Sequence, residues 1–394
     1  MKKQTQAIHL EYERRDAYDS LSVPVYNTLA YEFDNAAVMA EAFTDKIKAP
    51  DYSRVENPTV TNLERRVAAL TDAAHATAFN SGMAAISNTI MALAAQGKNI
   101  VTSKHLFGNT YALLVATLRR FGVKVRLRDL TNIEAVREAI DDDTCCVFLE
   151  ILTNPQLEVA DLKAISEVAH EKNVPLVVDS TVIPFTQFSA KSLGVDIEVV
   201  SSSKYVSGGA TSLGGLVIDY GTPYNGDFAK RLYGEMLFNF GAYMTPQVAY
   251  MQTIGLETLD ARYRVQSSNA LELAKKLRSL PQIKYVNYVG LEDNPYHELA
   301  QRQFGKTAGA MICIDLESKE ACFSFLNNLK LIHRATNLFD NRSLAIHPAS
   351  TIFGAFSESM RKSMDVKDTT IRLSVGLEDV DDLFEDIKQA VDSL

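Results

Sequence analysis

A run of serines and one lysine follows a short apolar segment near the middle of the chain. The segment IEVVS at 197–201 predicts a strand, and Ser203 and Lys204 come directly after it. A lysine that is desolvated at the end of a strand has a lowered pKa and becomes a nucleophile. In an extended chain Ser201 and Ser203 point to the same side, so their hydroxyls could face a phosphate. The pattern is therefore suited to a phosphorylated aldehyde that forms a Schiff base with Lys204.

Two further features would complete such a site. SGMAAI at 81–86 opens an apolar helical stretch, and the N–H groups of Gly82 and Met83 at a helix N-terminus can bind an anion. Asp179 ends the apolar segment VPLVVD and could supply a negative charge to a protonated pyridine nitrogen. An amine, phosphate donors and an anion are the three groups that pyridoxal 5′-phosphate (PLP) requires from a protein.

Each feature also has an ordinary structural explanation. Lys204 alone would more commonly be a surface lysine, and Asp179 alone a helix cap. SGMAAI alone is a weak helix-start signal, and the serines could form a turn. What favours the functional interpretation is their order. Polar residues follow three successive apolar strands, at 150–154, 179–181 and 201–204, and ligands of open α/β sheets bind beyond the carboxyl ends of the strands.

The elements that must position these residues alternate between strand and helix. Apolar segments lie at 99–103, 123–127, 145–150, 174–179 and 197–201, with helical patterns between them. Strands of this kind predict an α/β fold with a mainly parallel sheet flanked by helices. A long helical pattern at about 256–279 and mixed strands and helices after it predict a smaller C-terminal α+β domain.

We therefore expect three parts in the chain: an N-terminal arm at 1–60, a PLP-binding α/β domain at 61–255 and a C-terminal α+β domain at 256–394. The arm is rich in tyrosine, phenylalanine and proline but lacks the periodicity of a self-contained core. Such a segment is more easily explained if it packs on a second subunit.

Composition narrows the function classes. The 394 residues carry a net charge of −9, which argues against nucleic acid or an anionic membrane as partner. There is no apolar run of about 18 residues, and the N-terminus does not resemble a signal peptide. The four cysteines lack metal-ligand spacing, so we expect no metal and interpret them as reduced thiols of a cytoplasmic protein.

From about residue 18 to the end, the chain resembles the cystathionine γ-synthase type of PLP enzymes, which act in cysteine and methionine metabolism. YSRVENPT at 52–59 resembles that family's YSRxxNPT, VVDSTVIPF at 177–185 resembles VVDNTFATP, and SSSKYVSGG at 201–209 resembles SATKYxxGH. The resemblance implies a transferase fold like that of aspartate aminotransferase. It also implies a homo-oligomer with shared active sites. This oligomer would be at least a dimer, and the resemblance favours a tetramer.

The resemblance assigns roles to single residues. Lys204 would be the Schiff-base lysine, and Asp179 would contact the pyridine nitrogen. Tyr52 and Arg54 would reach the cofactor phosphate of a neighbouring subunit. The remaining residues expected to contact the cofactor are Gly82, Met83, Phe107, Thr181, Ser201 and Ser203.

Three residues are expected to bind substrate. Asn154 in LEILTNP would touch the cofactor ring oxygen or the substrate carboxylate, and Ser343 would lie near that carboxylate. Arg372 would bind the α-carboxylate. Physical reasoning supports this last role, because the apolar residues of IRLSV alternate and leave Arg372 free as a bidentate clamp.

Within the family, GGATSLGGLVIDYG at 208–221, VGLEDNPYHELA at 289–300 and NLFDNRSLAIHPAST at 337–351 resemble O-acetylhomoserine sulfhydrylases. Four residues depart from the family's pattern: Phe107 replaces a tyrosine, Gly209 a histidine, Arg342 a glutamate and Phe353 a histidine. Phe107 can still stack on a ring but has no hydroxyl to donate.

The expected reaction is γ-replacement on O-acetyl-L-homoserine, in which sulfide or a thiol gives homocysteine or methionine plus acetate. Acetate can leave without an acid catalyst, whereas a thiolate gains from one, so Phe107 disfavours a methionine γ-lyase. The alternatives are cystathionine γ-synthase, γ-lyase or methionine γ-lyase activity. An alternative of another class is a catalytically weak paralogue that binds PLP or a partner protein. The sulfur donor and the acyl group of the substrate stay open.

Overall fold

The computed structural model describes residues 1–10, 16–44 and 46–394. Its larger sheet has seven strands in the order β1-β7-β6-β5-β4-β2-β3. The strands are β1 His75–Phe79, β2 Asn99–Ser103, β3 Lys124–Arg128, β4 Thr144–Glu150, β5 Leu176–Asp179, β6 Ile197–Val200 and β7 Gly215–Asp219. Only β7 runs antiparallel to its neighbours, β1 and β6. The expected mainly parallel sheet is confirmed.

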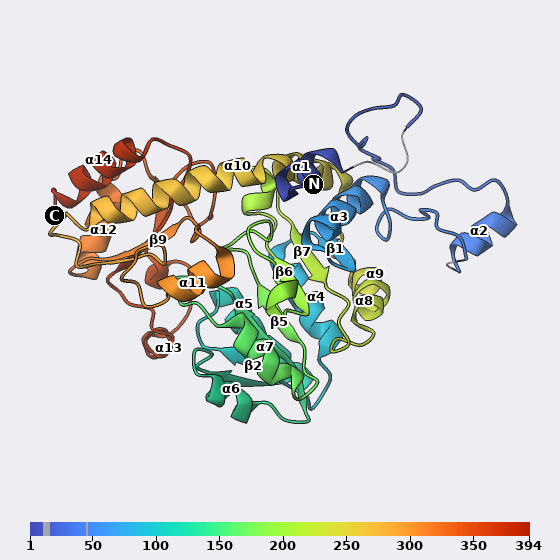
Figure 1. Cartoon of the computed structure of the whole chain (residues 1–394), viewed down its shortest axis with the longest axis horizontal. Coiled ribbons are helices and arrows are strands. Elements are labelled where there is room, and N and C mark those ends of the chain that lie inside the picture. Colours follow the sequence, from blue (N-terminus) through green and yellow to red (C-terminus); the bar gives the residue numbers. More distant parts are fainter. Residues whose placement is uncertain (11–15, 45) are drawn as a thin grey trace.

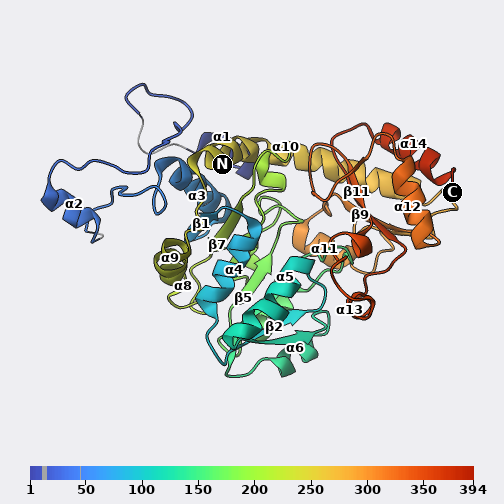
Figure 2. The ribbon, with the colours of Figure 1, turned by 180° about the vertical axis from the view of Figure 1, so that it is seen from behind.

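Both faces of this sheet are covered because its strands are apolar on both sides. Val147 and Leu149 of β4 belong to one core, and Cys146 and Phe148 belong to the other. The first core contains α3 (Pro58–Thr71), α7 (Leu162–His170) and part of α10 (Pro246–Leu277), and the second contains α4 (Gly82–Leu93). Helix α7 lies in front of the sheet in Figure 1. In the view from behind, α4 and α5 (Gly108–Ala112) lie in front of the opposite face of the sheet (Figure 2).

A second, smaller sheet has five strands in the order β10-β11-β12-β9-β8. The strands are β8 Tyr285–Asn287, β9 Met311–Asp315, β10 His333–Arg334, β11 Leu344–Ile346 and β12 Thr370–Ser374. Neighbours are antiparallel except β10 and β11. The associated helices are α11 (His297–Phe304), α12 (Lys319–Asn328), α13 (Glu358–Ser363) and α14 (Val380–Val391). The expected C-terminal α+β unit is thus present.

Helix α10 (Pro246–Leu277) joins the two sheets and crosses the top of the molecule in Figure 1. We expected this helix to begin at about 256, but it begins ten residues earlier, so a domain boundary at 255/256 falls inside it. Its apolar pattern does not mark its start because polar side chains such as Gln252, Arg262 and Gln266 are also buried. Gly255, a residue that weakens helices, obscures the start further.

Gly255 lies where α10 touches the loop that follows Lys204. A Cβ atom on Gly255 would lie 2.1 Å from the Val206 carbonyl oxygen and 2.7 Å from the Gly208 nitrogen. Seven residues on, the Arg262 guanidinium donates to the Tyr205 carbonyl oxygen at 2.8 Å. The helix backbone therefore supports the segment that carries Lys204, and only glycine allows this approach.

The N-terminal part of the chain divides into two. Helix α1 (Lys3–His9) packs on its own chain: Lys3 donates to the Phe188 carbonyl oxygen at 2.8 Å, and Gln4 donates to that of Glu257 at 2.9 Å. Beyond it, the segment with α2 (Ala36–Ala42) extends away from the body of the molecule (Figure 1). Within the described residues, no helix is both long and apolar enough to span a membrane.

Substitution of Gly255 by alanine tests the contact between α10 and the lysine loop. Although alanine favours helices, we expect Gly255→Ala to lower the free energy of unfolding by about 1–3 kcal/mol, because the added methyl overpacks the contact. Gly234→Ala is the matched control, since a Cβ at Gly234 meets no atom within 4 Å. Urea unfolding of both variants measures the effect. A Gly255→Ala midpoint at or above that of the unmodified protein would contradict the account.

Candidate active site

A cavity of about 920 Å³ lies at the carboxyl ends of β4, β5 and β6, between the two sheets. Ten of the thirteen residues expected from the sequence line it. They are Gly82, Met83, Phe107, Asn154, Asp179, Thr181, Ser201, Ser203, Lys204 and Arg372. Strand ends supply most of them, while Arg372 comes from β12 of the smaller sheet. Both sheets therefore contribute to one site.

Lys204 provides the amine of the cavity. Its Nζ donates to Asn337 Oδ1 at 2.9 Å. Burial, together with the charge of Arg372, lowers the pKa of Lys204 to about 8. An amine with that pKa is uncharged in a useful fraction of molecules near neutral pH and can act as a nucleophile or base.

Two acids, Glu150 buried and Asp179 half-buried, lie side by side at the floor of the cavity. Asp179 ends β5, Glu150 ends β4, and the two residues are paired in register, so their side chains share one side of the sheet. Burial raises the pKa of Asp179, and burial with the Asp179 charge raises that of Glu150 to about 8. No lysine or arginine within the described ranges forms an ion pair with either acid. The floor thus fits a cationic group such as a protonated pyridine nitrogen.

The start of α4 forms the anion-binding end. Ser81 Oγ caps the helix by accepting the Ala84 N–H at 3.1 Å, and the N–H groups of a helix's first turn have no partner within the helix. A Cβ atom on Gly82 would lie 2.6 Å from the Ser201 Cβ, so only glycine lets the helix start approach that serine. This cradle fits the phosphate of PLP. The Ser203 hydroxyl, by contrast, already has backbone partners. It donates to the Gly214 carbonyl oxygen at 3.1 Å and accepts the Gly214 N–H at 2.9 Å.

Arg372 forms the end that suits a carboxylate. The side chain is 2% exposed, and its Nη1 donates to Asn154 Oδ1 at 3.2 Å. Burial lowers its pKa to about 10, which keeps it charged at neutral pH. Its Nε has no hydrogen-bond partner among the described atoms. A buried guanidinium with unused donors fits the bidentate binding of a carboxylate.

Glu150 connects the two loops that carry Phe107 and Asn154. Its carboxylate accepts the Phe107 N–H, and its second oxygen accepts the Asn154 N–H at 3.2 Å. The sequence shows Glu150 at a strand end, but nothing in its pattern reveals that a single carboxylate links both loops. Asn337, which contacts Lys204, was also missed, although it lies in the recognised segment 337–351.

Three expected residues lie elsewhere. The Ser343 hydroxyl donates to Glu378 at 2.8 Å and accepts the Gly376 N–H at 2.8 Å, so it braces a turn and does not line the cavity. Tyr52 is 41% exposed, and Arg54 donates to the Phe238 carbonyl oxygen. Neither Tyr52 nor Arg54 lines the cavity of its own chain.

Of the four departures from the family pattern, only Phe107 lines the cavity. Phe353 is buried in the core, and Arg342 forms an ion pair with Asp340 at 3.0 Å. Gly209 has φ 119°, and a Cβ there would lie 2.3 Å from Asn341 Nδ2, so a histidine would not fit this backbone. No set of three His, Cys, Asp or Glu residues within the described ranges could hold a metal ion.

Comparison with known proteins agrees with this geometry. Residues 4–392 match the family model described as Cys/Met metabolism PLP-dependent enzyme. The chain is 37% identical to an L-methionine γ-lyase of Fusobacterium nucleatum, with 99% of this chain and 98% of that protein covered. It is 32% identical to the O-acetyl-L-homoserine sulfhydrylase of Corynebacterium glutamicum, with 98% and 95% covered.

A solved structure is similar along its whole length. It is described as an O-acetylhomoserine (thiol)-lyase of Campylobacter jejuni with N′-pyridoxyl-lysine-5′-monophosphate. It superposes with a TM-score of 0.95 at 34% identity, and the match covers 100% of both chains. With the family model matched over nearly every residue, this chain belongs to the PLP-dependent enzymes of cysteine and methionine metabolism.

Proposed function

We propose that the chain catalyses γ-replacement on O-acetyl-L-homoserine, in which a sulfur nucleophile replaces acetate. Sulfide would give homocysteine, and methanethiol would give methionine. The observation that carries the proposal is the cavity wall around Phe107. Among the described residues of this chain that line the cavity there is no tyrosine, histidine or cysteine, so the ring of Phe107 offers no hydroxyl to a basic leaving group at the position where the family has a tyrosine.

The roles of the chain's own residues follow from the site. Arg372 and Asn154 would bind the α-carboxylate, and this orients Cα toward Lys204. Lys204, the only amine among the described lining residues, would remove the Cα proton and then a Cβ proton. Asp179 would keep the pyridine nitrogen protonated. When bound, PLP supplies the electron sink that stabilises negative charge at Cα.

The leaving group distinguishes the candidate substrates. A thiolate is a basic leaving group, and its departure from Cγ is helped by a positioned acid. Acetate is a much weaker base and leaves without such help. An apolar wall with Phe107 therefore suits an acylated homoserine better than methionine.

Two other reactions have support from relatives. The identity to the L-methionine γ-lyase, 37%, is somewhat higher than the 32% identity to the O-acetyl-L-homoserine sulfhydrylase. The chain is also 34% identical to an O-succinylhomoserine sulfhydrylase of Pseudomonas aeruginosa, over 97% of this chain and 93% of that protein. A paralogue that only binds PLP is a weaker candidate, because the amine, the acid and the arginine of an active site all line one cavity.

A substrate matrix tests the proposal. O-acetyl-, O-succinyl- and O-phospho-L-homoserine are each supplied with sulfide, and L-methionine is supplied alone. We expect sulfide-dependent acetate release to be the fastest reaction. We also expect Phe107→Tyr to raise methanethiol release from methionine by roughly tenfold or more, because it restores a proton donor. If the unmodified enzyme releases methanethiol from methionine faster than acetate from O-acetylhomoserine, the proposed substrate is wrong.

We further propose that Tyr52 and Arg54 serve the cavity of a second copy of the chain. The support is that neither residue lines its own cavity, and that the nearby segment with α2 projects from the body (Figure 1). In a symmetric dimer such a segment can complete the partner's site. Arg54 would then bind the cofactor phosphate through charge-assisted hydrogen bonds.

Complementation tests this arrangement. Inactive Lys204→Ala and Arg54→Ala chains are mixed under conditions that exchange subunits. If sites are shared, each hybrid dimer has one site with both defects and one with neither, so activity returns to about a quarter of that of the unmodified enzyme. A mixture of Lys204→Ala with Asp179→Ala is the control and should stay inactive, because both residues line one chain's cavity. Absence of recovery despite proven exchange would show that Arg54 serves its own chain.

A further inference from the structure

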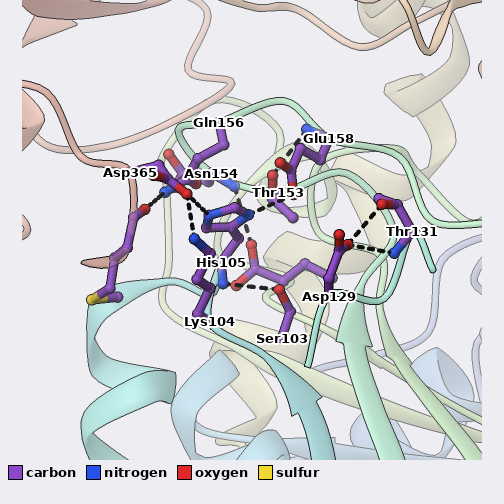
Figure 3. A network of polar contacts seen from close by, with 12 residues as sticks. Ser103, Lys104, His105, Asp129, Thr131, Thr153, Asn154, Gln156, Glu158 and Asp365 are labelled. Atoms are coloured by element: carbon purple, nitrogen blue, oxygen red, sulfur yellow. Dashed lines mark hydrogen bonds and ion pairs between the residues drawn. The ribbon is translucent and has the colours of Figure 1, made fainter. Parts of the chain in front are cut away.

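His105 lies outside the cavity, at the centre of a polar network that joins three segments of the chain (Figure 3). It is in the loop between β2 and α5, two residues before Phe107, and its side chain is 8% exposed. Its Nδ1 lies 2.5 Å from Glu158 Oε2, and its Nε2 lies 2.8 Å from Asp365 Oδ2. Each ring nitrogen therefore faces a carboxylate.

This geometry favours a protonated ring. A neutral imidazole has one N–H donor, so its other nitrogen would present a lone pair to a carboxylate, whereas an imidazolium donates from both nitrogens. Burial lowers the pKa of His105, but the hydrogen bond and charge of Glu158 and the hydrogen bond of Asp365 outweigh burial and raise this pKa above its ordinary value. The nearby Lys104 acts in the opposite direction without reversing the result.

The two carboxylates belong to segments that form the active site. Glu158 ends the loop of Asn154, where its N–H donates to Thr153 Oγ1 at 3.0 Å. Asp365 follows α13 in the smaller unit, and Lys104 Nζ contacts it at 2.6 Å. Gln156 adds a second link between these segments by donating to the Met364 carbonyl oxygen at 2.7 Å.

The segment held by Asp365 also forms a wall of the cavity. Ile352, Phe356 and Met360 line the cavity, and Met360 belongs to α13. His105 thus connects the loop of Phe107, the loop of Asn154 and the wall contributed by the smaller unit. At longer range, Tyr296 interacts electrostatically with Glu158, and Tyr296 interacts in the same way with Asp129.

We propose that protonated His105 is a positioning residue that holds Phe107 and Asn154 against the cavity wall of the smaller unit. It touches neither substrate nor cofactor. It acts through Glu158 and Asp365, and it makes the affinity for an amino acid substrate depend on a proton outside the cavity. The proposal is independent of which acyl group the substrate carries.

The direction of the pH effect follows from the raised pKa. The contacts of protonated His105 with its two carboxylates are complete below the pKa of an unperturbed histidine, about 6.5. These contacts are lost as pH rises through the higher pKa of His105 in the folded protein. Amino acid affinity should therefore fall with rising pH through this group, and a variant without the imidazole should lack this component.

L-norvaline binding to the PLP-loaded enzyme tests the proposal, because norvaline has no leaving group and its binding changes the visible spectrum of the cofactor. At pH 6 we expect His105→Gln to raise the Kd of norvaline about tenfold, as one charged contact is worth about 1.4 kcal/mol. At a pH well above the pKa of His105, the two proteins should bind norvaline equally. Glu171→Gln, which breaks the exposed Arg137–Glu171 pair, is the control and should match the unmodified enzyme at every pH.

NMR titration of the imidazole supplies a readout that does not involve binding. The His105 signal, assigned by its loss in His105→Gln, should titrate above 6.5, and Asp365→Asn should lower its pKa and move the affinity change to lower pH. A pKa at or below 6.5 would overturn the proposal, and so would a ratio of the two Kd values that does not change with pH. If His105→Gln does not fold, the exposed Asp365→Asn change decides the question, because it should lower the pH at which the affinity for norvaline falls.

Discussion

Glu150, which is buried, and Asp179, which is half-buried, are carboxyls on neighbouring strands, and no cation within the described ranges forms an ion pair with them. Burying a charge is costly unless it is paired, and a lone acid usually becomes protonated instead. The arrangement has a physical explanation if a cationic group occupies the cavity above these acids. The protonated pyridine nitrogen of PLP is such a group, and membership of a PLP-dependent family agrees with it.

The rest of the fold places the complementary charges around this floor. Lys204 follows β6, the next strand of the sheet, and Arg372 comes from the smaller sheet. Neither is paired with the acids, because Lys204 contacts Asn337 and Arg372 contacts Asn154. Helix α10 supports the lysine loop through Gly255, and the same helix extends into the smaller unit that carries Arg372. The packing of α10 against the lysine loop therefore helps to keep Lys204 and Arg372 apart from the two acids.

The sequence predicts the parts of this arrangement that follow from local pattern. Apolar strands that end in polar residues located Asp179 and Lys204, and alternation in β12 isolated Arg372 from its apolar neighbours. Contacts between segments that lie far apart in the sequence do not produce a local sequence pattern. The sequence pattern points to Ser343 and does not reveal Asn337, because a linear motif does not say which side chain reaches Lys204. Glu150 and His105 act through partners that are 43 and 260 residues away, and the start of α10 is hidden by buried polar side chains.

The proposed chemistry depends most on Asp179. Exchange of the Cα proton of L-norvaline in D₂O tests it directly, because this step needs the electron sink but no leaving group. In Asp179→Ala we expect PLP to remain bound, as its visible absorbance will show, while the exchange rate falls by orders of magnitude because the pyridine nitrogen loses its anion. An exchange rate equal to that of the unmodified enzyme would contradict the account.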